Sequence, residues 1–171
     1  MSKEELRKKI QEQEEKTRKY CNYLFPTIFK KNFVKGYNTT LTANVDYQFT
    51  AQTSTYDVEV KMLNHSFNYM SMIGGCGIKC DKHVRIKNFN EVSGNEKLIY
   101  MVVLYDAIII YDFAAVDLNK VKYFMWKEKE KELDDDSKIV EVPAFNIPLS
   151  MSKQIYYMDN TQWYETFNGK K

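Results

Sequence analysis

The sequence predicts an α+β domain in which a mixed central β-sheet is flanked by helices. Three observations favour this fold class. An amphipathic helical pattern fills the first 25 residues, strand-like segments follow between residues 40 and 113, and hydrophobic residues make up 44% of the 171-residue chain. A chain of this length and composition can bury a core without disulfides or metals, so we expect residues 1–171 to form a single domain.

Residues 3–25 are expected to form the N-terminal helix. Apolar and small side chains recur there at spacings of three, four and seven residues, which predicts one stripe along the helix. The stripe consists of Leu6, Ile10, Thr17, Cys21 and Leu24. Pro26 follows, and because proline lacks an amide hydrogen, it is expected to end or kink the helix.

Strand-like composition then recurs over a predicted core sheet at about residues 40–113. Residues 40–49 and 56–63 are predicted strands, and residues 83–89 alternate apolar with basic side chains, which also predicts a strand. Residues 97–113 are largely apolar and are interrupted at Asp106, which predicts either a tight hairpin or one long bent strand.

The C-terminal part, residues 117–171, is expected to contain a helix and an irregular tail. Asp117 can cap a helix that runs to about residue 133. The tail from Val140 onwards carries prolines and is expected to be irregular, with another short helix near residues 150–158.

Cysteine usage predicts a reduced, cytoplasmic protein without membrane association. The chain has three cysteines, no secretory signal, and no apolar run of roughly 18 residues. Cys76, Cys80 and His83 have a spacing that suggests zinc, but a fourth ligand is missing, so buried thiols are the preferred interpretation. The net charge of +2 does not by itself indicate a polyanionic partner.

The segment NVDYQFTAQTSTYDVEVKM, residues 44–62, places acidic residues on two predicted strands, where aspartate is disfavoured. If Phe49 and Tyr56 close a hairpin, Asp46 lies opposite Glu59, and Lys61 shares their face. The other face is then wholly apolar and consists of Val45, Tyr47, Phe49, Tyr56, Val58 and Val60.

Two carboxylates that face each other across a hairpin repel unless a positive group lies between them. A Mg²⁺ or Mn²⁺ ion would satisfy the hard oxygen ligands of Asp46 and Glu59. A lysine beside such an ion, as Lys61 would be, can orient a water molecule and stabilise developing negative charge.

Asp46, followed thirteen residues later by Glu59-Val60-Lys61, resembles the D…(D/E)xK signature of the PD-(D/E)xK nuclease superfamily. The resemblance implies a restriction-endonuclease-like core with an αβββαβ order of elements. It also implies a metal-dependent endonuclease that hydrolyses phosphodiester bonds in DNA rather than RNA. Asp46 and Glu59 would then hold Mg²⁺ or Mn²⁺, Lys61 would orient the attacking water, and Glu14 would be a further metal ligand.

Other interpretations of the acidic hairpin stay open. In one, its polar face is exposed to solvent and Asp46 pairs with Lys61. In another, the chain is a non-catalytic module that binds nucleic acid or protein, or a structural protein, from a mobile element or phage.

Basic residues follow the hairpin closely in the sequence. They are Lys79, Lys82, Arg85 and Lys87. We expect them to contact the phosphate backbone of a nucleic acid, or equally to form the solvated face of one strand. The sequence leaves the oligomeric state open, with a homodimer among the alternatives.

Overall fold

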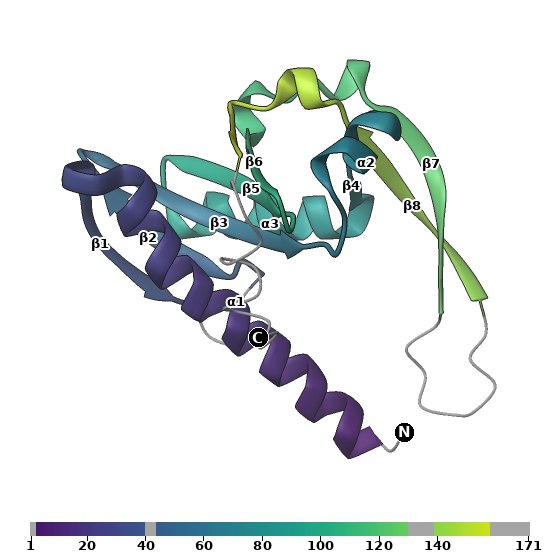
Figure 1. The fold of residues 1–171 in the computed structure, drawn as a ribbon, viewed down its shortest axis with the longest axis horizontal. Helices are drawn as coiled ribbons and strands as arrows, with labels where there is room; N and C mark the ends of the chain where they lie inside the picture. The colour runs from purple at the N-terminus through teal and green to yellow at the C-terminus, as the bar shows by residue number, and fades with distance from the viewer. Residues whose placement is uncertain (1–2, 40–43, 130–138, 158–171) are drawn as a thin grey trace.

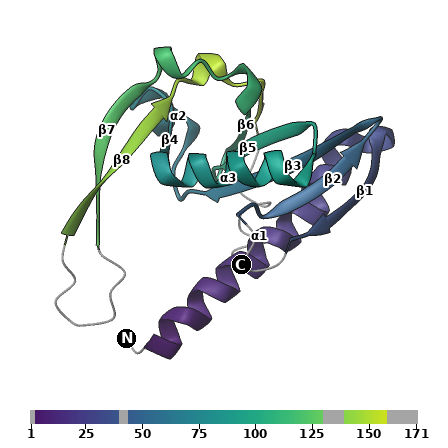
Figure 2. The same cartoon turned by 180° about the vertical axis from the view of Figure 1, so that it is seen from behind.

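The computed structural model describes residues 3–39, 44–129 and 139–157. Within these ranges, the side chains of a few residues, Glu14 among them, lie outside the description. Helix α1 (Lys3–Phe29) and helix α3 (Cys80–Ser93) cover opposite faces of the larger of two sheets, as Figure 1 and the reverse view in Figure 2 show.

The larger sheet has six strands in the order β1-β2-β3-β5-β6-β9. They are β1 (Phe33–Asn38), β2 (Tyr47–Ala51), β3 (Ser54–Met62), β5 (Lys97–Val103), β6 (Ala107–Asp112) and β9 (Gln154–Tyr157). Strands β3 and β5 are parallel, and the other neighbours are antiparallel. The order α1-β1-β2-β3-α3-β5 confirms the predicted αβββαβ arrangement and the mixed sheet flanked by helices.

A parallel pair needs a long crossover, and the connection from β3 to β5 provides it. This crossover contains α2 (Phe67–Met72), β4 (Cys76–Lys79) and α3. Strand β4 belongs to the second sheet, whose order is β4-β8-β7, with β7 (Lys122–Lys129) and β8 (Ile139–Ile147) paired as a long antiparallel ribbon (Figure 1). Short 3₁₀ turns complete the chain at Lys30–Asn32, Phe113–Ala115, Leu118–Lys120 and Leu149–Met151.

The core consists of two hydrophobic clusters, one on each face of the central sheet. Under α1, Cys21 and Leu24 pack in the same cluster as Val58, Val60 and Met101. On the other face, side chains of α3, β5 and both strands β4 and β8 share one cluster, so this cluster joins the two sheets. Strands β5 and β6 contribute to both clusters, which explains the long apolar run at residues 97–113. Of the two predicted alternatives for this run, the structure has the hairpin.

Helix α1 confirms the predicted stripe where its side chains are described, since Thr17, Cys21 and Leu24 are buried. Leu6 and Ile10 lie outside the described side chains. Of the two effects expected of Pro26, an end of the helix is wrong, because α1 continues past it to Phe29, beyond the predicted end at residue 25. Aromatic packing accounts for the extra turn: the ring centroids of Phe25 and Phe49 are 4.5 Å apart, and those of Phe29 and Phe49 are 5.0 Å apart.

The predicted strand at residues 83–89 is also wrong, because these residues belong to helix α3. The less exposed side chains of α3 include Lys82, Ile86 and Phe89, which recur at helical spacing. Gly94 ends the helix with a left-handed backbone (φ 71°), and its amide donates a hydrogen bond to the carbonyl of Asn90 at 3.2 Å. The short alternation at residues 83–89 therefore concealed a longer helical pattern.

The predictions for the C-terminal part are wrong within the described residues. The carboxylate of Asp117 accepts a hydrogen bond from the amide of Asn119, but it caps only a 3₁₀ turn, and strand β7 follows. Residues 130–133 of the predicted helix lie outside the described part. In place of an irregular tail, residues 139–147 form β8 and residues 154–157 form β9. Of the short helix predicted near residues 150–158, the described part contains only the 3₁₀ turn Leu149–Met151.

Strand β8 tolerates Pro143 because of where that residue lies. The pairing of β8 with β4 covers only Ala144–Ile147, so at Pro143 strand β8 has a partner on one side alone. In the part of the chain that the structure describes, no helix is long and apolar enough to cross a membrane.

Candidate active site

Strands β2 and β3 form the acidic hairpin in the predicted register. Gln48 lies opposite Asp57, and Phe49 lies opposite Tyr56. Strand β2 begins later than predicted, at Tyr47, and residues 44–46 form a bend; residues 40–43 of the predicted strand lie outside the described part. The amide of Asp46 still donates to the carbonyl of Val58 at 2.9 Å, which keeps Asp46 beside β3.

The bend moves one residue away from its predicted face. Val45 packs in the cluster on the α3 side, whereas Val60 packs in the cluster under α1. A bend breaks the strict alternation of side chains along an extended strand, so the prediction for Val45 is wrong. The other apolar residues of the hairpin share one face, as predicted, and the structure places this face under α1: Tyr47, Phe49, Tyr56, Val58 and Val60.

Asp46 and Glu59 bring their carboxylates together at the start of the hairpin. One oxygen of Asp46, Oδ2, accepts a hydrogen bond from the amide of Val60 at 2.8 Å, which fixes the side chain against β3. Glu59 is only 8% exposed. Its burial, together with the neighbouring negative charge of Asp46, raises the pKa of Glu59 to about 8, although Lys82 acts in the opposite direction.

The two oxygens of Glu59 have different surroundings. The Nζ atom of Lys82 lies 2.9 Å from Oε1 and also donates to the carbonyl of Asn44 at 3.2 Å. The other oxygen, Oε2, is buried without a hydrogen-bond donor among the described residues. The carboxylate of Asp46 cannot donate to it unless one of the two groups is protonated. With both groups ionised, the site would have a buried acceptor and an excess of negative charge, and without a cation the raised pKa means that Glu59 holds a proton at neutral pH.

Lys61 follows Glu59 by two residues, so the two side chains share one face of β3. This is the face covered by α3, because Glu59 lies beside Tyr100 in the pairing with β5, and Tyr100 packs in the cluster on the α3 side. Lys61 is exposed whereas Glu59 is buried. Lys61 therefore lies on the solvent side of the site and Glu59 on its buried side.

Asp57 has a structural role. It is fully buried, and its carboxylate accepts four hydrogen bonds of 2.5–2.7 Å. The donors are Gln48, Asn90, Ser93 and Asn95. Because Asn90 and Ser93 belong to α3, this carboxylate ties the C-terminal end of the helix to the hairpin. Asp57 and Glu59 on the polar face of β3 thus lie buried under α3, so the interpretation of a wholly solvent-exposed polar face is wrong, whereas the pairing of Asp46 with Lys61 stays a prediction.

The four basic residues predicted to bind nucleic acid do not share one face. Lys82 is half-buried and contacts Glu59, while Arg85 pairs with Asp81 at 3.1 Å. Arg85 and Lys87 are two residues apart on a helix, so they point in directions that differ by about 200°. Lys79 ends β4. The prediction of one strand face is wrong, because the segment is helical.

The contact between Lys82 and Glu59 is the feature of the site that sequence reasoning missed. A helical interpretation of residues 80–94, based on the spacing of Lys82, Ile86 and Phe89 and on Gly94, would have placed a lysine toward the sheet. The sequence alone does not indicate which carboxylate it meets.

The spacing of Cys76, Cys80 and His83 suggests zinc, but buried thiols are the preferred interpretation, and Cys76 is indeed buried. Cys76 lies in β4, and burial raises the pKa of its thiol to about 11. His83 packs instead between the rings of Phe113 and Phe145. No group of three or more His, Cys, Asp or Glu side chains able to hold a metal is found among the described residues, which do not include the side chain of Glu14.

No protein-family model matches the sequence, and no curated protein matches it. Among solved structures, the chain is similar to Hjc, a Holliday junction resolvase from the archaeal hyperthermophile Archaeoglobus fulgidus. The TM-score is 0.44 and the sequence identity 12%, over 75% of this chain and 87% of that chain.

Proposed function

We propose that this chain is a metal-dependent nuclease of the PD-(D/E)xK type that hydrolyses phosphodiester bonds in DNA. The observation that carries the proposal is the buried, unpaired Oε2 of Glu59 beside the carboxylate of Asp46. When Glu59 is ionised, an unpaired buried acceptor and two adjacent like charges both destabilise the folded state, which is why its pKa is raised in the absence of a cation. Oxygen-bound Mg²⁺ or Mn²⁺ would relieve both, so the residues fit such an ion.

In this proposal Asp46 and Glu59 hold the metal ion, and Glu14 on α1 is a further candidate ligand. A bound divalent ion would lower the pKa of a water molecule coordinated to it and would offset the negative charge that develops on the phosphate. Lys61 orients the attacking water and stabilises the same charge from the exposed side of the site. The amide of Val60 holds Asp46 in place, and the ion pair with Lys82 holds Glu59.

The ion pair of Lys82 with Glu59 favours a second candidate function. A lysine at 2.9 Å already supplies positive charge to one oxygen of Glu59. The cluster of Asp46, Glu59 and Lys82 then serves to fasten α3 to the hairpin, and the chain is a non-catalytic module that binds nucleic acid.

Cleavage assays with matched lysine variants test the proposal. Labelled DNA and RNA are incubated with wild type, Lys61→Ala and Lys35→Ala, in Mg²⁺, Mn²⁺ or EDTA. Lys35 is an exposed lysine on β1 and serves as the control. Loss of one preorganised charged group should lower turnover by about 100- to 1000-fold, with binding nearly unchanged. If wild type cleaves nothing and Lys61→Ala loses binding, the binding module is the better interpretation.

Metal binding is measured separately by thermal unfolding. An ion that binds only the folded protein stabilises it by about 2.7 kcal/mol at a hundredfold excess over the Kd. Asp46→Asn and Glu59→Gln should each abolish the rise in Tm. An equal rise in wild type and both variants would mean that the ion binds elsewhere.

A further inference from the structure

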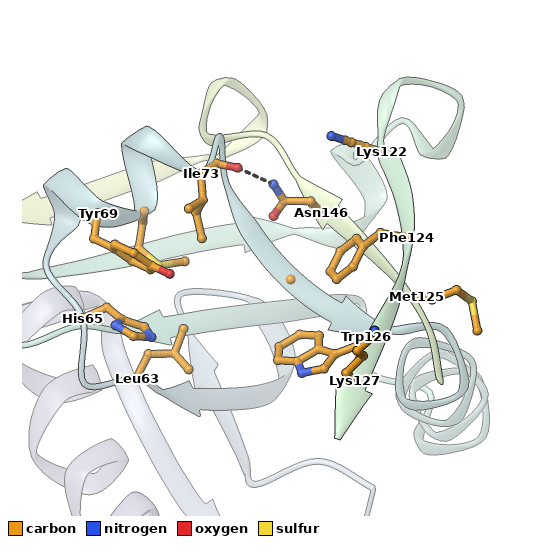
Figure 3. Close-up of a pocket in the computed structure, with 12 residues that line it drawn as sticks. Leu63, His65, Tyr69, Ile73, Lys122, Phe124, Met125, Trp126, Lys127 and Asn146 are labelled. Atoms are coloured by element: carbon orange, nitrogen blue, oxygen red, sulfur yellow. Dashed lines mark hydrogen bonds between the residues drawn. The ribbon is translucent and has the colours of Figure 1, made fainter. Parts of the chain in front are cut away.

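A cavity of about 640 Å³ lies between the α2 segment and the second sheet. Figure 3 shows its two aromatic sides, with His65 and Tyr69 on one and Phe124 and Trp126 on the other. The rings of His65 and Tyr69 stack at a centroid distance of 4.5 Å. Those of Phe124 and Trp126 stack at 6.0 Å.

The aromatic sides are accessible from solvent. Tyr69 is 40% exposed and Phe124 is 38% exposed, which is unusual for large apolar rings that face one cavity. Gly77 accommodates the ring of Trp126, because a Cβ atom at position 77 would lie only 2.8 Å from Cζ3 of the indole. The backbone of β4 thus lies directly against the indole and supports it as part of the wall.

The charge of the cavity is positive. Lys122 and Lys127 line it, and none of the lining residues, all of which the structure describes, is acidic. Lys127 lies 3.6 Å from Glu141, which offsets part of its charge. Lys122 makes no ion pair with any described residue. Aromatic faces combined with lysines suit bases joined by phosphates, because every base has a face that stacks on a ring.

The cavity adjoins the candidate active site through β3. Leu63 lines the cavity, and its amide donates to the carbonyl of Val103 at 2.9 Å, which continues the extended pairing of β3 with β5. Glu59, Lys61 and Leu63 alternate with the residues between them, so they share one face. Four residues of extended chain span about 13 Å, a distance that a few nucleotides cover.

We propose that this cavity binds unpaired bases of a nucleic-acid strand. The preferred substrate is then single-stranded or carries unpaired nucleotides close to the bond that is cut. Base faces are hidden in a continuous duplex and become available to aromatic side chains when a base is unpaired. The identification of this strand as a substrate rests on the proposed nuclease function, whereas the binding of the bases does not.

The test uses fluorescence of Trp126 and binding of a single-stranded oligonucleotide. The chain contains two tryptophans, so Trp163→Phe leaves Trp126 as the one reporter. This full-length protein is titrated in EDTA with a thymidine 12-mer, a blunt duplex of the same length and poly-glutamate. We expect the single strand to quench Trp126 and to bind at least tenfold more tightly than the duplex. Equal affinity for both, or equal quenching by poly-glutamate, overturns the assignment.

Variants locate the binding site. Phe124→Ala and Tyr69→Ala remove exposed rings and should weaken single-strand binding by about 5- to 150-fold each. Lys122→Ala, at an exposed position, should reduce the slope of log binding constant against log salt concentration by about 0.7, the value for one lost phosphate contact on a single strand. Tyr37→Ala, which removes a 50% exposed ring on β1, is the control and should bind like wild type.

The outcomes separate this proposal from the nuclease proposal. If wild type cleaves nucleic acid while Phe124→Ala, Tyr69→Ala and Lys122→Ala bind the single strand normally, the cavity assignment is overturned and the nuclease stands. If these variants weaken binding and wild type cleaves nothing under any condition, the cavity assignment stands and the nuclease proposal fails.

Discussion

Asp57 and Glu59 lie two residues apart on one strand face, yet their surroundings have opposite consequences. Every donor around Asp57 is directed at its carboxylate, and the residue is closed off from solvent and from any ligand. Among the described residues, Oε2 of Glu59 is a buried oxygen that accepts no hydrogen bond from a donor group, and it lies beside a second carboxyl group. Hydrogen-bond saturation thus distinguishes an acid that stabilises the fold from an acid that is placed to bind a cation.

The two aspartates of the hairpin should respond oppositely to the same substitution in metal-free protein. Asp46→Asn keeps an acceptor for the amide of Val60 and, above pH 8 where Glu59 is ionised, removes a neighbouring negative charge, so stability there should stay unchanged or rise. Asp57→Asn replaces a carboxylate oxygen by an NH₂ group that faces other donors, so it should lower the free energy of unfolding by roughly 2–4 kcal/mol. Urea unfolding in EDTA measures both. Strong destabilisation by Asp46→Asn would show that Asp46 is a structural ion-pair partner.

The pKa of Glu59 predicts how stability depends on pH without metal. Burial and Asp46 raise this pKa from 4.5 to about 8, so between these values the folded protein holds a proton that the unfolded chain has lost. The contribution of this bound proton to the free energy of unfolding is complete below pH 4.5 and is lost as the pH rises to 8, which lowers the free energy of unfolding by on the order of a few kcal/mol.

The free energy of unfolding, measured in EDTA between pH 5 and 8, checks this dependence. Glu59→Gln should remove the part of the decline that belongs to Glu59, so the difference between wild type and variant isolates it from His83 and other titrating groups. Parallel curves for the two proteins would mean that Glu59 titrates normally in the folded state.

At the scale of elements, the sequence predicted the features that depend on neighbouring residues and missed those that depend on contacts between distant parts of the chain. The register of β2 and β3 follows from side-chain alternation and a short loop, so Asp46, Glu59 and Lys61 could be brought together from the sequence. The contact of Lys82 with Glu59 joins a helix to a strand across a crossover, and no local pattern indicates it. For the same reason β7 and β8, which are stabilised by pairing with each other, were predicted as a helix and an irregular tail.

Helix α3 places Lys82 at one end and Asn90 at the other, and Gly94 terminates it. The left-handed backbone of Gly94 (φ 71°) penalises any residue with a Cβ atom, although the space around it is open. Gly94→Ala should therefore cost about 1 kcal/mol in urea unfolding, and Gly94→Asn should cost less. A loss as large for Asn as for Ala would contradict a conformational origin.

At the scale of the whole molecule, two buried tyrosines connect the sheets. The hydroxyl of Tyr100 on β5 donates to the carbonyl of Gly77 on β4 at 3.0 Å. The hydroxyl of Tyr111 on β6 donates to the carbonyl of Ile147 on β8 at 3.2 Å. Since the same hydrophobic cluster spans these four strands, the candidate active site and the aromatic cavity are built on one connected core.

This connection makes the single-domain expectation testable. If the two sheets form one cooperative unit, two measurements should give the same urea midpoint. They are the fluorescence of Trp126 on β7, recorded in the Trp163→Phe variant, and far-UV circular dichroism. Tyr100→Phe leaves the carbonyl of Gly77 without this donor and should lower both midpoints together, by about 1–3 kcal/mol in unfolding free energy. Tyr37→Phe, at an exposed tyrosine on β1, should change neither. A Trp126 transition at lower urea than the circular dichroism transition would mean that the second sheet unfolds separately, and the single-domain prediction would be wrong.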